Sequence, residues 1–95
     1  MPERLQLEPS DETLLVFPTD FPIKVMGKTQ PDFAQKMLEI VLRHAPDYRA
    51  DTMEMRASNA GHYLSLTFTI RATSKEQLDA IYREISKHPM VAMAL

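Results

Sequence analysis

Few residues of this 95-residue chain have side chains suited to metal or acid–base chemistry. No two of the three histidines, His44, His62 and His88, have the three- or four-residue spacing that a pair of metal-binding histidines on one helix uses. The absence of cysteine excludes thiolate nucleophiles, disulfides and zinc–sulfur sites. We therefore predict neither a metal site nor a cofactor. His44 and His88 fit helix C-termini, where an imidazole complements the helix dipole.

Nucleophilic and phosphate-binding sites also find little support in the residue spacing. Ser58 and His62 bracket a short polar segment, but no motif fixes an acid or an oxyanion hole near them. A phosphate-binding turn needs several glycines before a helix, whereas Gly27 stands alone and Pro31 lacks an amide donor. We therefore expect a protein without catalytic activity. A hydrolase or phosphotransferase that depends on His62 or Lys24 is a less favoured alternative.

Composition and charge indicate an ordinary globular protein, with 44% hydrophobic and 25% charged residues. The formal net charge of −2 provides no overall field to attract nucleic acid or an anionic membrane. No stretch approaches the roughly 18 apolar residues of a membrane span, and the start of the chain does not resemble a secretory signal. We expect a cytoplasmic protein that binds neither membranes nor nucleic acid, and an RNA-binding module is a less favoured alternative.

Alternating apolar and polar residues predict four strands, at 21–27, 52–57, 63–73 and 91–95. Gly27 is expected to end the first strand, with a backbone conformation closed to other residues. The second strand has one apolar side, formed by Met53, Met55 and Ala57. The polar segment 58–62 has the composition of a hairpin loop.

Two amphipathic helices are predicted between these strands. The first is expected to be capped by Thr29 or Gln30, to carry Pro31 in its first turn and to end near residue 44. The second is capped by Ser74, and Gln77 completes a capping box. Its apolar side is a narrow stripe, formed by Leu78, Ile81, Tyr82 and Ile85.

The order β-α-β-β-α-β predicts an α+β protein with a ferredoxin-like two-layer sandwich and an antiparallel sheet in strand order 4-1-3-2. Both helices must cover the same sheet face, because each has a single apolar side. The opposite face is then exposed and is a candidate interaction face. Its candidate residues are Lys24, Met26, Arg56, Ser65, Thr67, Thr69 and Arg71.

The first 16 residues are predicted to be an acidic arm preceding a single domain at 17–95. Acidic residues dominate positions 1–20, where Arg4 is the one base, and Pro2, Pro9 and Pro18 interrupt any helical pattern. The arm is interpreted either as mobile with a short anchored end, or as a segment whose apolar cluster 14–17 adds an edge strand or docks on a partner.

The segment FPTDFPIKVMG at 17–27, with RHAP at 43–46 and VAMAL at 91–95, resembles the YbeD-like family of small bacterial proteins. The resemblance implies a ferredoxin-like fold similar to ACT domains, which bind small ligands and regulate metabolic enzymes. It also implies a link to lipoate metabolism. ACT domains bind ligand at the turn after the first strand, often across a dimer interface. The matching positions here are Gly27, Lys28, Thr29, Gln30 and Pro31.

Two hypotheses on function follow from the sequence. The first is a non-catalytic regulatory domain, expected to be a homodimer, that senses a small molecule at the 27–31 turn. The second is an adaptor that binds a partner protein through the open sheet face or the N-terminal arm.

Overall fold

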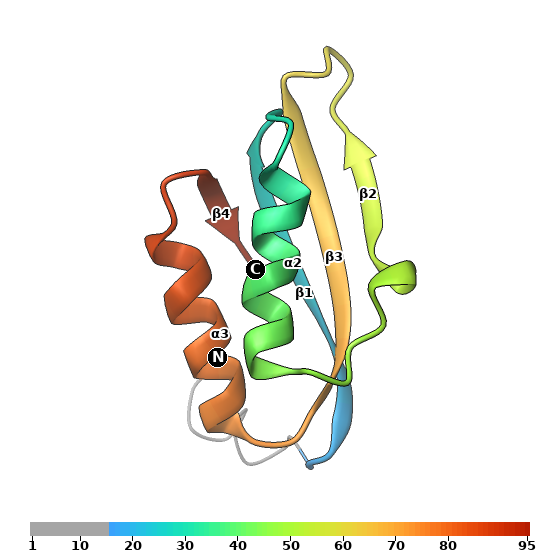
Figure 1. The fold of residues 1–95 in the computed structure, drawn as a ribbon, viewed down its shortest axis with the longest axis vertical. Helices are drawn as coiled ribbons and strands as arrows, with labels where there is room; N and C mark the ends of the chain where they lie inside the picture. The colour runs from blue at the N-terminus through green and yellow to red at the C-terminus, as the bar shows by residue number, and fades with distance from the viewer. Residues whose placement is uncertain (1–15) are drawn as a thin grey trace, which may run out of the picture.

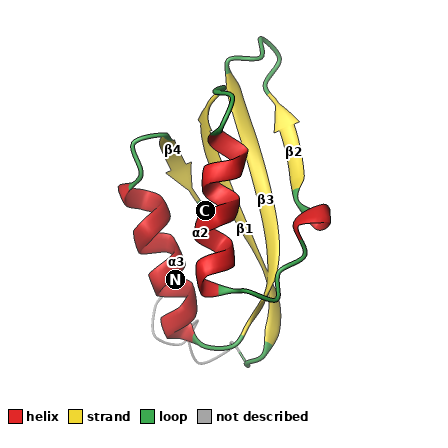
Figure 2. Ribbon diagram, in the orientation of Figure 1, coloured by secondary structure: helices red, strands yellow, loops and turns green. Residues whose placement is uncertain are grey.

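Two helices lie side by side on one face of a four-stranded antiparallel sheet in the computed structural model, which describes residues 16–95 (Figures 1 and 2). The sheet order is β2-β3-β1-β4. This arrangement confirms the predicted α+β, ferredoxin-like βαββαβ fold. The predicted acidic arm lies outside the described residues, except for Val16. The elements are β1 (Thr19–Lys28), α2 (Phe33–His44), the 3₁₀ turn η1 (Ala50–Thr52), β2 (Glu54–Ala57), β3 (Tyr63–Ala72), α3 (Lys75–Lys87) and β4 (Val91–Ala94).

The two long strands at the centre of the sheet, β1 and β3, pair along their whole length, from Thr19↔Ala72 to Lys28↔Tyr63. Inward-facing residues of both strands are buried against the helices and form the core with them. The fully buried large side chains are Phe33, Phe68, Ile23, Met37, Leu66, Ile70, Ile81, Ile85, Val25 and Val41. The alternation predicted at 63–73 and the apolar stripe predicted for the second helix are therefore confirmed.

The first helix begins later than predicted, at Phe33, with Asp32 at the cap position and no side-chain capping bond. The predicted cap at Thr29 or Gln30 is wrong, and Pro31 precedes the helix. The physical reason is that Thr29 bonds to the hairpin loop instead, through its amide and its hydroxyl.

The second helix has the predicted start. The Gln77 N–H donates to Ser74 Oγ at 3.1 Å. The Gln77 side chain reaches back and accepts from the Thr73 N–H at 2.7 Å. This pair of bonds satisfies two backbone donors at the start of α3, as a capping box does, although the second donor belongs to the residue before the cap.

Gly27 lies inside β1, which is longer than predicted, and does not end the strand. Among the described residues, a positive φ occurs only at Gly61, so the expected special conformation of Gly27 is wrong. A Cβ atom at Gly27 would lie 2.3 Å from the Met90 carbonyl oxygen and 2.8 Å from the Phe33 ring. Glycine is required here because the backbone at Met90 and the ring of Phe33 approach too closely for a side chain.

The edge strand β2 is exposed along all four residues. The prediction that its apolar side would be buried is wrong for Met55, which is 53% exposed, and for Ala57. Met53, just before the strand, is half-buried. Figure 1 shows the reason: α2 lies over β1 and β3, and β2 extends beyond the area that the helices cover.

Candidate interaction face

The sheet face opposite the helices is uncovered and carries all seven residues of the predicted interaction face. Cross-strand pairing places them together, with Lys24 opposite Thr67, Met26 opposite Ser65 and Arg56 beside Ser65. Ser65 and Thr67 are half-buried in the middle of the sheet, and the charged side chains around them are exposed. We call this surface the open face.

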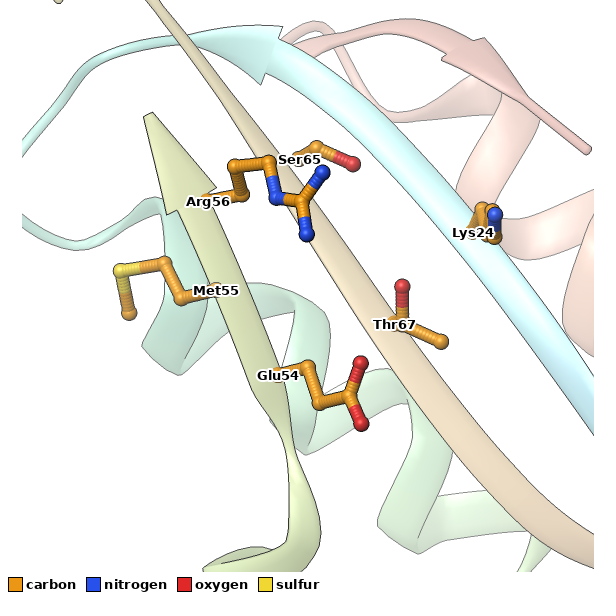
Figure 3. A pocket seen from close by; sticks show the side chains of 6 residues that line it. All are labelled: Lys24, Glu54, Met55, Arg56, Ser65 and Thr67. Atoms are coloured by element: carbon orange, nitrogen blue, oxygen red, sulfur yellow. The ribbon is translucent and has the colours of Figure 1, made fainter. Parts of the chain in front are cut away.

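A hollow of about 220 Å³ lies on the open face near β2 (Figure 3). Arg56 and Glu54 project from β2 over β3, while Met55 points the other way. The hydroxyls of Ser65 and Thr67 form its floor. Neither Glu54 nor Arg56 forms an ion pair with another residue of the described chain. The hollow therefore presents charges of both signs that are free to bind a partner.

A β-bulge turns Met93 and the following Leu95 onto the open face. The register shifts between Met26 and Gly27, so that Met26 pairs with Met93 whereas Gly27 pairs with Val91. Val91 packs against the core, but Met93 faces away from it with Met26. The sequence alternation at 91–95 predicted one apolar side for this strand, and the bulge makes that prediction wrong, because one extra residue reverses the side on which those that follow lie.

The result is an exposed apolar cluster on the open face, formed by Met26, Tyr63, Met93 and Leu95. They are 38%, 43%, 50% and 65% exposed, respectively. Leu95 belongs to it because its backbone exchanges two hydrogen bonds with Lys24, at 2.8 and 3.1 Å, which places both side chains on one face. Met26 and Tyr63 also line a hollow of about 170 Å³. Of these four residues, only Met26 was among the predicted residues of the interaction face.

The far end of the open face is occupied by an ion pair. Arg71 Nη1 donates to Asp20 Oδ1 at 3.3 Å, and both residues line a hollow of about 180 Å³ with Thr69. Thr69 and Arg71 therefore lie on the predicted face, but Arg71 already has a carboxylate partner within the chain.

The predicted ligand-binding turn at 27–31 is only partly open to a ligand. Gly27 is buried in the sheet, and Thr29 donates its N–H to His62 O and its hydroxyl to Gly61 O, at 2.9 and 2.6 Å. Lys28 and Gln30 line a hollow of about 260 Å³. Its other walls are Tyr63, Pro89, Met90, Val91 and Ala92. Two of the five predicted residues thus meet at a surface hollow, and the turn offers no row of free amides.

The side chains of two of the three histidines, His44 and His88, have hydrogen-bond partners. His44 Nε2 lies 2.7 Å from Glu84 Oε1, which joins the two helices. His88 Nδ1 accepts from the Met90 N–H at 3.2 Å and so supports the turn before β4. Ser58 Oγ accepts from the Tyr63 N–H at 3.2 Å, within the hairpin. Within residues 16–95, no group of three or more His, Asp or Glu side chains could hold a metal ion.

Comparisons with known proteins agree on the family and the fold. Residues 12–95 match the family described as "Protein of unknown function (DUF493)". A UPF0250 protein of Bordetella pertussis is 54% identical over 87 residues, which cover 92% of this chain and 96% of that protein. A UPF0250 protein of Ralstonia nicotianae is 52% identical, covering 92% and 90%. No helix among the described residues is long and apolar enough to cross a membrane.

The solution structure of protein HP0495 from H. pylori has the same fold, with a TM-score of 0.71 and 16% identity over 96% of this chain and 98% of that one. At that identity the likeness concerns the fold alone. The relatives and the matched family confirm the resemblance to the YbeD-like proteins. This chain belongs to the bacterial DUF493 (UPF0250) family, whose members are of unknown function.

Proposed function

We propose that this protein is a non-catalytic regulatory domain that binds a partner protein through the open face of its sheet. The partner contributes an acidic segment that carries apolar side chains. The observation that supports this proposal is the exposed apolar cluster of Met26, Tyr63, Met93 and Leu95, because contiguous apolar surface on a small domain typically marks an interaction site.

The charges around the apolar cluster favour an acidic partner. Lys24 precedes Met26 and Lys28 follows it on the same side of β1, and Arg56 shares a hollow with Met26. None of these three cations pairs with a carboxylate of the described chain. Asp20 forms an ion pair with Arg71, so that Glu54 is the unpaired acid among the described residues of this face. Interfaces commonly combine an apolar centre with a complementary charged rim.

A photo-crosslinking experiment tests which face the partner uses. A benzophenone amino acid replaces Met93 on the open face or, as the control, Gln35 on the exposed side of α2. We expect a discrete crosslinked product in cells when the benzophenone amino acid is at position 93. We expect no such product when it is at position 35. Crosslinks from position 35 alone would contradict the use of the open face.

The captured protein is then purified and its affinity measured with charge variants. The double variant Lys24→Glu/Lys28→Glu should weaken binding by at least tenfold, about 1.4 kcal/mol, because it reverses two rim charges. The control variant Lys36→Glu/Lys87→Glu makes the same change of four charge units on exposed positions of α2 and α3 and should leave the affinity unchanged. Equal weakening by both variants would mean that net charge alone matters, and would argue against a contact at Lys24 and Lys28.

A small-ligand sensor is the second candidate function, favoured by the 260 Å³ hollow beside Lys28 and Gln30. The ammonium of Lys28 and the amide of Gln30 suit a carboxylate ligand, such as an amino acid or a free lipoyl or octanoyl acid. Titration of these compounds against the amide resonances of a labelled sample tests this candidate. Shifts confined to residues 28–30 and 89–92 would support it, and no shift with any compound would count against it.

A further inference from the structure

The edge strand β2 has three properties that fit it for pairing with a second copy of this chain. It lies at one end of the sheet and outside the cover of the helices. Its side chains are all exposed. Free edges of this kind present unpaired backbone donors and acceptors and are a common site of strand addition. What such a strand pairs with depends on which backbone groups and which side chains it presents.

The backbone of β2 presents Met55 and Ala57 at its free edge. The Ser58 N–H donates to Tyr63 O in β3 at 2.9 Å, and the direction of the backbone groups alternates along a strand. The backbone N–H and C=O groups of Arg56 and Glu54 therefore bond to β3. Those of Met55 and Ala57 point toward the free edge. The Met53 N–H is engaged with Ala50 O at 3.2 Å, so the available edge ends at that residue.

Only a few registers are compatible with these backbone groups in an antiparallel pair of two β2 strands. Met55 must lie opposite an equivalent edge-facing residue, which excludes every register that shifts by one residue. A pair centred on Arg56 sets two arginines against each other, and one centred on Glu54 sets two glutamates against each other. The register centred on Met55 instead places Glu54 opposite Arg56 of the second copy, twice by symmetry, and opposite charges across strands are favourable.

The side chains on the helix side of β2 agree with the same register. Met55, 53% exposed, would meet its own copy at the two-fold axis. Met53 would lie opposite Ala57 of the second copy. The three positions that the sequence pattern marked as an inner apolar side, and that the helices leave partly uncovered, would thus cover one another.

We propose that this protein forms a two-fold symmetric dimer through β2, in the register that pairs Met55 with Met55 and Glu54 with Arg56. The two four-stranded sheets then form one continuous sheet with all helices on one side and both open faces on the other. The contact is small for a protein interface, so the dimer is weak and its population rises with protein concentration.

Sedimentation velocity over roughly 5–500 µM tests the dimer, because a weak interface dissociates within this range. The variants Glu54→Arg and Arg56→Glu each create like-charge pairs in the proposed register and should raise the dissociation constant by about tenfold or more. The double variant Glu54→Arg/Arg56→Glu restores opposite charges and should return the constant close to its original value. Lys36→Glu is the control for net charge and should have no effect.

A proline at position 55 tests the backbone bonds separately. Met55→Pro removes an N–H that faces the free edge and takes no part in the ladder with β3, and proline is tolerated at such positions. It should abolish the dimer while the far-ultraviolet circular dichroism stays that of the parent. A protein that is monomeric at the highest concentration, single charge variants that still dimerise, or open-ended association through the β4 edge would each overturn the proposal.

Discussion

At the level of single residues, the two glycines of the chain serve different structural needs. Gly27→Ala places a methyl group 2.3 Å from a backbone oxygen, and backbone cannot move aside as a side chain can. We expect a loss of about 3 kcal/mol in the free energy of unfolding, at the upper end for overpacking. Gly61 has space around it but a φ of 75°, so Gly61→Ala should cost only about 1 kcal/mol. Urea denaturation measures both, and equal losses would contradict the steric argument.

Two tyrosine hydroxyls provide a second residue-level comparison. Tyr48 packs edge-on against Phe68, with ring centroids 5.8 Å apart, and its buried hydroxyl has no hydrogen-bond partner in the described chain. Tyr82 donates its hydroxyl to Leu95 O at 2.6 Å. Tyr48→Phe should therefore raise the unfolding free energy by about 1 kcal/mol, and Tyr82→Phe should lower it by a similar amount. Loss of stability in Tyr48→Phe would show that its hydroxyl is satisfied by water.

At the level of elements, the bond from Tyr82 holds the end of the chain beside β1. Burial raises the pKa of the Tyr82 hydroxyl above its ordinary value of 10.0. Since the folded state holds this proton more tightly than the unfolded state, the contribution of the Tyr82 hydroxyl to the free energy of unfolding is complete below pH 10. It is lost as the pH rises through the pKa that this hydroxyl has in the folded protein. Thermal unfolding from pH 8 to 11 should show a steeper loss of Tm in the parent than in Tyr82→Phe. Parallel curves would contradict a raised pKa.

The elements differ in how far the sequence determines them. The start of α3 and the inner face of β3 were predicted correctly, because Ser74, Gln77 and the alternation at 63–73 act within a few residues of one another. The side of the sheet on which the residues of β4 lie was predicted wrongly, because the bulge opposite Met26 arises from pairing with a strand that is distant in the sequence. Burial of β2 was also mispredicted, since a strand pattern does not reveal how far the helices extend over the sheet.

At the scale of the whole molecule, the candidate site also combines features that local sequence patterns predict with features that depend on the pairing of distant segments. The seven predicted residues of the open face follow from strand order and alternation, both of which are local patterns joined by simple topology. The apolar cluster depends on Met93 and Leu95, whose outward direction appears only when β1 and β4 are aligned. The turn at 27–31 was proposed by resemblance, and the hydrogen bonds of Thr29 to the hairpin loop limit what it can bind.

The alternating direction of the backbone hydrogen bonds in β2 leads to a final prediction for the dimer, which amide hydrogen exchange can measure. In the monomer, the amides of Met55 and Ala57 face solvent and should exchange rapidly, whereas Glu54 and Arg56 are protected by β3 at every concentration. Raising the protein concentration should slow exchange at Met55 and Ala57 alone, in step with the dimer fraction. In Arg56→Glu these two amides should remain fast. Protection of Met55 that does not change on dilution would place another segment of the chain, rather than a second copy, against this edge.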